Sequence, residues 1–300
     1  MILLPYSAGR DRPDNSVRNS MDQQALSRQI EQFLAEDLGL GDITTDSIFP
    51  PEQEGSAVFV AKEEFIVAGV EEIAPLVFKT RNSRIVCAPQ QHDGCLVTSG
   101  TIIFSASGPV RDLLSAERLA LNLAQRLSGI ATLTASFVEQ VKGLPIKIVD
   151  TRKTTPGLRV LEKYAVRVGG GHNHRFNLAD GILIKDNHIA ACGSIRKAVQ
   201  TVRAHAPHTL KIEVETENLR QVEECLACGV DIIMLDNMDP ETMRKAVALI
   251  NGRCLVEASG GVNLKNVRTI AQTGVDLISV GALTHSARAM DISMRLTILG

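Results

Sequence analysis

The first regular pattern of apolar residues along the chain is helical. Leu26, Ile30, Phe33 and Leu34 recur three and four positions apart within residues 22–38, and two glycines follow soon afterwards. Residues at this spacing share one face of a helix, and glycine is typical of the position just beyond a helix end. We therefore expect an amphipathic helix over residues 22–38.

Short β-prone segments separated by turn residues come next. They are bounded by Gly, Pro and Asp, and they cover residues 57–60, 65–68, 84–87 and 102–105. This pattern is typical of short strands joined by turns. Ser115 then stands before a run that carries Leu119, Leu123 and Leu127, and we expect it to be the N-cap of a helix. Together these segments predict a small β-rich domain that includes the leading helix.

From residue 146 onward, short apolar strands alternate with helical stretches. Six strands are expected, at residues 146–150, 182–185, 211–215, 232–236, 254–259 and 277–281. The last four begin about 22 residues apart, the spacing of strand–helix units in a parallel sheet or barrel. The pattern leaves open a closed barrel or an open doubly wound sheet, because both bind ligands at the carboxyl ends of their strands.

The composition disfavours several classes of partner. The 32 Lys and Arg residues against 34 Asp and Glu residues give a net charge of −2, so nothing draws the whole chain to nucleic acid or to an anionic membrane. Aromatic residues make up 3% of the chain, with no Trp, and no apolar run is long enough to span a bilayer. We expect no nucleic-acid partner and no membrane partner.

Two further features bear on the cellular location. The first apolar block is too short for the core of a signal peptide and a polar stretch follows it, so residues 1–21 are expected to be a disordered tail. Six scattered cysteines favour reduced thiols in the cytoplasm. Cys225 and Cys228 form a C-x-x-C pair in an expected helix over residues 219–228. Without a second such pair, buried apolar packing is favoured over zinc binding or redox chemistry.

Cationic residues gather where the first two strands of the parallel region end. Arg152 and Lys153 follow the first strand, Lys185 ends the second, and His174 and Arg175 lie in the loop between them. The carboxyl ends of barrel strands meet at one face, where active sites form. Clustered cations are costly to desolvate without anions, and the planar guanidinium of Arg matches a carboxylate or a phosphate. The pattern predicts a polyanionic ligand rather than a solvated surface loop.

Glycine-containing turns follow the last two expected strands. Ser259 and Gly260 come after the fifth strand, and Gly281 comes after the sixth. Glycines let backbone N–H groups approach a phosphate closely, and loops after the final strands of such barrels often hold one. A single glycine pair would be an ordinary turn, but two such loops at these places predict phosphate binding.

Two acidic residues, Glu215 and Asp236, end the third and fourth expected strands. Their carboxylates suit Mg²⁺, usually through water, or the hydroxyl groups of a sugar. Ion pairing with the neighbouring cations explains them equally well. Both interpretations stay open on the residues alone.

Longer motifs carry a resemblance to a known family. Residues 150–159 are DTRKTTPGLR, residues 169–175 are GGGHNHR, residues 184–188 are IKDNH and residues 279–285 are SVGALTH. Further matches are EDLG at 36–39, GDIT at 41–44, AERLALN at 116–122, EVE at 213–215, LDN at 235–237 and SGGV at 259–262. On these motifs, residues 22–297 resemble the quinolinate phosphoribosyltransferases, also called carboxylating nicotinate-nucleotide pyrophosphorylases.

The resemblance implies a fold of the α/β class in two parts. An N-terminal α/β sandwich-like domain would cover residues 22–130 and be completed by residues 286–300. An irregular seven-stranded α/β barrel, like that of type II phosphoribosyltransferases, would cover residues 131–285, with the active site at the carboxyl ends of its strands. The resemblance also implies a homodimer in which one subunit covers the barrel mouth of the other. Assembly of such dimers into a hexamer stays open.

The resemblance further implies a reaction and its residues. Quinolinate and 5-phosphoribosyl 1-diphosphate would give nicotinate mononucleotide, diphosphate and CO2 with Mg²⁺, as a step of NAD biosynthesis. Quinolinate would contact Arg152, His174, Arg175 and Lys185, together with Arg118 of the partner subunit. The phosphoribosyl donor would contact Lys153, Glu215, Asp236, Ser259, Gly260, Gly281 and His285. The catalytic residues would be Lys153, Lys185, Glu215 and Asp236, with Mg²⁺ held by Glu215 and Asp236 through water.

Three alternatives compete with this interpretation. A barrel aldolase could form a Schiff base at Lys185, although this would leave Arg118, Arg152 and Arg175 unexplained. A related phosphoribosyltransferase could act on another nitrogen heterocycle, although a ligand without two carboxylates would leave those cations unpaired. A protein that only senses a dicarboxylate or a phosphosugar would be expected to lack Glu215, Asp236 or Lys153, and all three are present.

Overall fold

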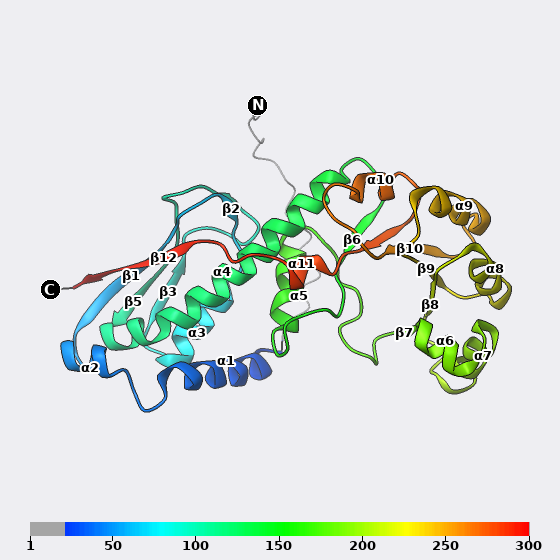
Figure 1. The fold of residues 1–300 in the computed structure, drawn as a ribbon. Coiled ribbons are helices and arrows are strands. Elements are labelled where there is room, and N and C mark those ends of the chain that lie inside the picture. Colours follow the sequence, from blue (N-terminus) through cyan, green and yellow to red (C-terminus); the bar gives the residue numbers. More distant parts are fainter. Residues whose placement is uncertain (1–21, 300) are drawn as a thin grey trace, which may run out of the picture.

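The structure, a computed structural model, describes residues 22–299, and the tail expected at residues 1–21 lies outside them. Figure 1 shows two parts, an antiparallel sheet with the first three helices and a parallel sheet with the later helices on its outer side. The long helix α4 (Val110–Gln140) runs from one part to the other. The domain boundary expected at residue 130 therefore falls inside a continuous helix.

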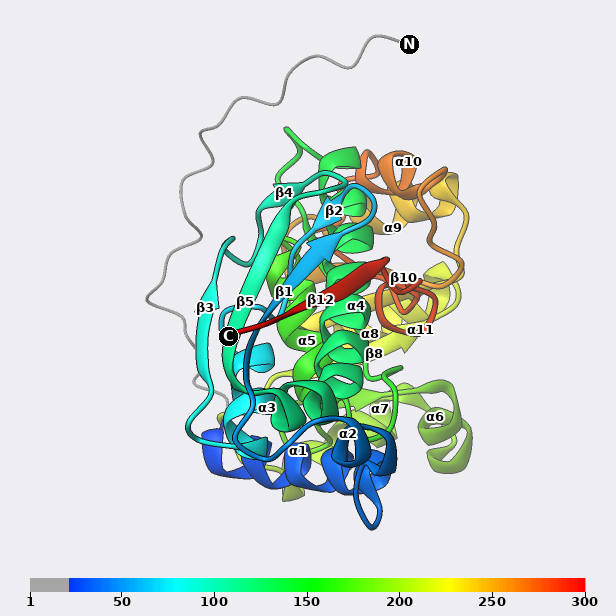
Figure 2. The same cartoon turned by 90° about the vertical axis from the view of Figure 1, so that its left-hand side faces the viewer.

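The antiparallel sheet has four strands in the order β12-β1-β5-β3. These strands are β12 (Ile292–Ile298), β1 (Glu54–Ala61), β5 (Ile102–Pro109) and β3 (Val86–Pro89). A separate pair is formed by β2 (Phe65–Ile66) and β4 (Leu96–Val97). Figure 2 shows β12, near the end of the chain, lying beside β1. The rings of Phe59, Phe78 and Phe104 lie 5.1–6.0 Å apart in the core beneath the sheet.

In the described part of the chain, the helices before α4 are α1 (Gln23–Leu38), α2 (Ile43–Ile48) and α3 (Ile73–Arg81). The prediction for residues 22–38 is confirmed, since Leu26, Ile30 and Leu34 are buried on one face of α1. The side chain of Asp22 accepts hydrogen bonds from the backbone N–H groups of the first turn, which starts the helix there.

The expected start of the next helix at Ser115 is wrong. Helix α4 begins at Val110, directly after β5, and Ser115 lies buried inside it. The Ser115 hydroxyl accepts a hydrogen bond from Arg81 Nε and donates one to the carbonyl of Asp112. Burial of apolar residues in the first turns, including Leu113, extends the helix past the side chain that looked like a cap.

The parallel sheet contains all six expected strands, in the order β6-β11-β10-β9-β8-β7. They are β6 (Lys147–Val149), β7 (Ile182–Ile184), β8 (Ile212–Thr216), β9 (Ile232–Asp236), β10 (Leu255–Ser259) and β11 (Leu277–Ser279). The connecting helices are α5 (Arg159–Val168), α6 (Asp186–Cys192), α7 (Ile195–His205), α8 (Leu219–Cys228), α9 (Pro240–Ile250), α10 (Val267–Ala271) and α11 (Ala282–His285). Every pair of neighbouring strands is parallel, so their carboxyl ends share one edge.

The resemblance implied seven strands, and the seventh is reduced to one residue. His172 pairs with Val149 through a single parallel bridge on the free side of β6. Its N–H donates to the carbonyl of Ile148, and its own carbonyl accepts from the N–H of Asp150. The ladder ends there because the N–H of His174 turns to the Asp150 carboxylate instead of continuing the pairing.

Cys225 and Cys228 lie on α8, as expected, and both are free thiols. Cys225 is fully buried among apolar residues, and burial raises the pKa of its thiol to about 12. Among the described residues, no helix is both long and apolar enough to cross a membrane.

A close contact inside α4 gives the first prediction. A Cβ at Gly129 would overlap the backbone oxygen of Arg288, whereas a Cβ at Gly181 would meet nothing within 4 Å. Gly129→Ala should lower the free energy of unfolding by about 1–3 kcal/mol or more, because backbone must shift. Gly181→Ala, the control, should leave it almost unchanged. Equal urea unfolding midpoints for the two variants would refute the close packing of α4 against the returning chain.

Candidate active site

Two arginines near the carboxyl end of β6 are close enough for the charge of one to act on the other. Arg152 follows this strand, and its Nε is buried with no hydrogen-bond partner among the described residues. Arg175 comes from the loop before β7, where its Nη1 donates to the carbonyl of Gly181 at 2.9 Å. Burial lowers the pKa of Arg175, and the charge of Arg152 lowers it further. Within residues 22–299, no ion pair involves either guanidinium. A bound anion would therefore neutralise their positive charges.

A buried ion pair holds the loop that carries Arg175. Lys163 of α5 and Asp150 at the end of β6 pair with both side chains fully buried. The Asp150 carboxylate also accepts from Asn173 Nδ2 at 2.6 Å and from the His174 N–H at 2.8 Å. Lys163 Nζ donates to the His174 carbonyl at 2.9 Å and lies 5.1 Å from the centre of the Phe176 ring. Removing one member of such a pair typically costs about 3–5 kcal/mol, so the loop is firmly placed.

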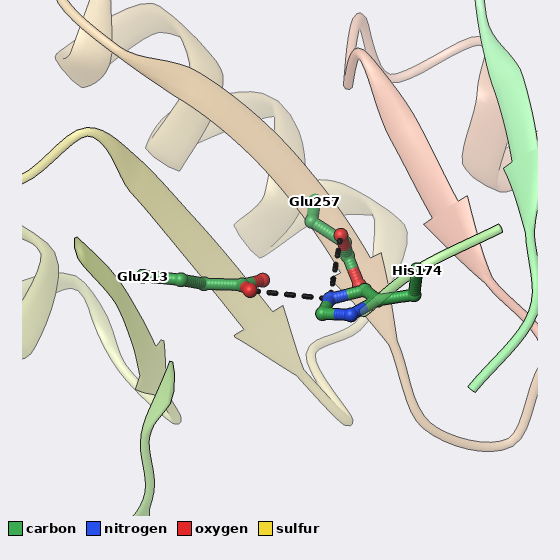
Figure 3. A group of neighbouring side chains, drawn as sticks. All are labelled: His174, Glu213 and Glu257. Atoms are coloured by element: carbon green, nitrogen blue, oxygen red, sulfur yellow. Dashed lines mark hydrogen bonds and ion pairs between the residues drawn. The ribbon is translucent and has the colours of Figure 1, made fainter. Parts of the chain in front are cut away.

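Beneath this loop, one histidine meets two buried glutamates (Figure 3). His174 Nε2 lies 3.2 Å from Glu213 Oε2 of β8 and 3.7 Å from Glu257 Oε2 of β10. His174 Nδ1 accepts the N–H of Arg175 at 2.8 Å, so the ring proton is on Nε2 and faces the carboxylates. Glu213 Oε1 and Glu257 Oε1 are buried without hydrogen-bond partners in the described chain. The three groups lie close enough together to hold a cation, but the Nε2 proton occupies the direction that a metal would need.

A second acidic pair lies at the carboxyl ends of β8 and β9. Glu215 Oε2 accepts from Lys185 Nζ at 3.3 Å, and Asp236 Oδ2 accepts from Asn237 Nδ2 at 2.7 Å. Burial raises the pKa of Glu215; the nearby Lys185 opposes this rise and Asp236 adds to it. A pocket of about 210 Å³ opens beside Glu215. Two neighbouring carboxylates suit Mg²⁺, which is usually held by one or two of them together with substrate phosphates.

The two glycine-containing loops are shaped by close contacts. A Cβ at Gly281 would lie 3.0 Å from Lys153 Cδ and 3.2 Å from His285 Nε2, so these three residues form one cluster. The hydroxyl of Thr284 donates to the Lys153 carbonyl at 2.8 Å, which ties the segment after β6 to α11.

The other loop follows Ser259 at the end of β10. Gly260 has a φ of +89°, and a Cβ there would overlap Asn237 Oδ1. The carbonyl of Ser259 accepts the N–H of Asn237 at 2.9 Å. Only glycine fits this position, so the loop keeps its backbone exposed beside the end of β9.

Among the expected site residues, Arg118 alone lies far from the others. It lies exposed in the first third of α4. Figure 1 shows this end of α4 beside α2, on the far side of the molecule from the parallel sheet. Most of the other expected residues stand on or just beyond the carboxyl ends of the strands, and they are Arg152, Lys153, Lys185, Glu215, Asp236, Ser259, Gly260 and Gly281. His174 and Arg175 lie in the loop between α5 and β7, and His285 ends α11.

Sequence reasoning missed Glu213 and Glu257. A signal was present, since Glu213 and Glu215 stand two positions apart in a strand, which turns both side chains to the same face of the sheet. Glu257 likewise follows two apolar residues, Leu255 and Val256, in the middle of β10. A carboxylate in the middle of a buried strand needs a partner, and here that partner is His174.

Comparison with known families matches almost the whole described chain. The family model described as "Quinolinate phosphoribosyl transferase, N-terminal domain" matches residues 42–128. The model described as "Quinolinate phosphoribosyl transferase, C-terminal domain" matches residues 130–295. The division between the two models falls inside α4, where the structure also passes from one sheet to the other.

Individual relatives agree with the family models. The chain is similar to a Bacillus subtilis protein named "Probable nicotinate-nucleotide pyrophosphorylase [carboxylating]", with 48% identity over 93% of this chain and 96% of the relative. It is similar to the "Nicotinate-nucleotide pyrophosphorylase [carboxylating]" of Mycobacterium leprae, with 44% identity over 89% and 95%. Among solved structures, NadC from Streptococcus pyogenes has a TM-score of 0.89 and 44% identity, covering 93% of this chain and 99% of that one.

The buried carboxyl of Glu257 makes the stability of the protein depend on pH. Burial, together with the charge of Glu213, raises its pKa from 4.5 to about 7, so folding favours the neutral form. The resulting stabilisation is complete below the ordinary pKa and is lost as the pH rises through about 7. Between about pH 5 and about pH 8, the wild-type melting temperature should therefore fall relative to that of Glu257→Gln. Glu241→Gln, on the exposed side of α9, is the control; parallel pH curves for wild type and Glu257→Gln would contradict this assignment.

Proposed function

The chain belongs to the quinolinate phosphoribosyltransferase family, and from this premise we propose how its own residues carry out the reaction. The enzyme joins quinolinate to 5-phosphoribosyl 1-diphosphate and releases diphosphate and CO2, which gives nicotinate mononucleotide for NAD biosynthesis. The observation that carries the residue assignments is the pair of arginines, Arg152 and Arg175, without carboxylate partners in the described chain.

Quinolinate carries two carboxylates on neighbouring carbons of a pyridine ring. We propose that Arg152 and Arg175 bind these carboxylates, with Lys185 and His174 at the edges of the same pocket. Guanidinium–carboxylate pairs are strong because they are charged and their planar groups match. A ligand with one carboxylate would leave one guanidinium unpaired, which argues against the alternative of a different heterocycle.

The phosphoribosyl donor is assigned to the opposite side of the strand ends. Lys153 and His285, which meet at Gly281, supply cations for the diphosphate, and the loop at Ser259 and Gly260 supplies backbone groups for phosphate. Glu215 and Asp236 face the ribose. Their negative charges stabilise the positive charge that develops on the sugar as diphosphate leaves.

The bond changes follow from this placement. The pyridine nitrogen attacks the anomeric carbon, and the bond from that carbon to the diphosphate breaks with its electrons leaving on oxygen. The ring nitrogen is then positively charged, so the ring accepts the electrons released when the adjacent carboxylate leaves as CO2. A proton takes the vacated ring position. No side chain needs to form a covalent bond, and Lys185 acts as the ion-pair partner of Glu215 rather than as a Schiff-base lysine.

We propose that Mg²⁺ binds at Glu215 and Asp236 through water. The fit rests on two neighbouring, partly exposed carboxylates, of which Glu215 lines a pocket. When bound, Mg²⁺ supplies positive charge to the departing diphosphate.

We also propose that the working unit is a homodimer that shares its active sites. Arg118 is exposed on α4, far from the parallel sheet of its own chain. Close to this end of α4, Leu40 is exposed in the turn between α1 and α2, and Ile43 and Ile48 are exposed at the two ends of α2. An exposed apolar patch beside a cation with no substrate in its own chain suits the barrel mouth of a second copy.

The free thiols of the described chain support a reducing compartment such as the cytoplasm.

Release of CO2 from carboxyl-labelled quinolinate tests the reaction and the pocket together. Release should require quinolinate, 5-phosphoribosyl 1-diphosphate and Mg²⁺, each omitted in turn. Arg152→Ala should lower kcat/KM by about 30-fold or more, since a charged pair with substrate contributes about 2–5 kcal/mol. Arg196→Ala, on the exposed side of α7, is the control. Full activity of Arg152→Ala would remove this arginine from the pocket.

Mixing two inactive variants tests the shared site. Arg118→Ala and Arg175→Ala should each be nearly inactive alone. After they are unfolded and refolded together, about a quarter of wild-type activity should return, because half of the dimers are mixed and each of these has one complete site. If Arg118 served its own barrel, no activity would return.

A further inference from the structure

We propose that Glu213 and Glu257 are positioning residues for quinolinate: these buried carboxylates clamp the His174 ring and thereby aim Arg175 at the substrate. The proposal rests on the assignment of Arg175 to the quinolinate pocket. It assigns a role to two residues that would not themselves touch either substrate.

His174 is held on both sides of its ring. Both of its ring nitrogens are used inside the protein, Nδ1 by the Arg175 N–H at 2.8 Å and Nε2 by Glu213 at 3.2 Å. Glu257 closes the other side of Nε2 at 3.7 Å. The ring is therefore a fixed link between the backbone of Arg175 and strands β8 and β10. Figure 3 shows the His174 ring between the two glutamates. Turning the ring would release the Arg175 backbone from the strands.

Glu213 also acts on the charge of Arg175. Arg175 is partly buried next to Arg152, which disfavours its charged form, and the charge of Glu213 opposes this effect. Glu213 therefore partly offsets the repulsion between the two guanidinium groups. It does so without occupying the side of Arg175 that faces the substrate. An ion pair with Arg175 itself would block the substrate carboxylate, whereas a carboxylate that pairs with the neighbouring His174 leaves the guanidinium available.

The cost of burying Glu213 and Glu257 separates this role from a purely structural one. Glu213 and Glu257 are 6% and 1% exposed, and each has one oxygen with no hydrogen-bond partner in the described chain. Burying such groups costs free energy, and at Glu257 a neutral group of the same shape removes that cost, because burial raises the pKa of this carboxyl. Residues that reduce stability and still occupy the floor of an active site are expected to serve function.

The test uses Glu213→Gln and Glu257→Gln, which keep the shape of the side chain, with Glu241→Gln as the control on exposed α9. Three quantities are measured for each full-length variant at about pH 7.5, namely the KM for quinolinate, the KM for the phosphoribosyl donor and the melting temperature. We expect the quinolinate KM of Glu213→Gln to rise about tenfold or more, since a charged hydrogen bond is lost. The KM for the donor should stay within about twofold, and the melting temperature of Glu257→Gln should not fall, because burial already disfavours the charged form of this carboxyl.

Two results would contradict the proposal. An unchanged quinolinate KM in both variants would overturn the proposal. So would a rise of both KM values together with a fall in melting temperature, which is the signature of a structural role. If a Gln variant does not fold, Glu257→Asp replaces it, and the same split between the two KM values is required.

Two further measurements distinguish failure of the proposed function, and metal binding by the three side chains, from failure of the positioning role. If the wild-type enzyme releases no CO2, the proposed function fails, and the positioning role is then judged by calorimetric binding of quinolinate to the same variants. If dialysis against EDTA abolishes quinolinate binding and Zn²⁺ restores it, the three side chains hold a metal instead. Under the proposal, quinolinate binding does not change with EDTA.

Discussion

The like charges of Arg152 and Arg175 are the constraint on which the rest of the site depends. Two guanidinium groups, partly removed from water and close enough to shift a pKa, repel each other. The fold gives neither of them a carboxylate partner among the described residues. Such an arrangement is maintained only if surrounding contacts are strong enough to impose it, and only if a ligand relieves it.

The surrounding contacts are buried and mutually dependent. The pair of Asp150 and Lys163 fixes the end of β6 and the loop beyond His172, so that Arg152 and Arg175 come from segments tied to the same carboxylate. Below them, His174 is linked to Glu213 and Glu257 on two other strands. The cationic pocket thus stands on an acidic layer, and the whole arrangement is close to neutral without placing an anion where the substrate binds.

Much of this could be predicted from the sequence, because strand spacing and strand-end chemistry are local properties. All six parallel strands and the first helix follow from periodicity, and the polar residues at the strand ends lie where the pattern places them. The start of α4 was not predictable from Ser115, since burial in the first turns decided it. The clamp around His174 was also missed, because it joins residues about 40 and 80 positions apart, and no periodic pattern records such a contact. The place of Arg118 depends on a second copy of the chain, which no single-chain pattern can locate.

Calorimetric binding of three related acids to the wild-type enzyme tests the central claim most directly. Quinolinate has two adjacent carboxylates and a ring nitrogen, phthalate keeps both carboxylates without the nitrogen, and nicotinate keeps the nitrogen with one carboxylate. If two unpaired arginines define the pocket, quinolinate and phthalate should bind with similar Kd values, and nicotinate should bind about tenfold more weakly or less well still. Nicotinate binding as tightly as quinolinate would contradict the account.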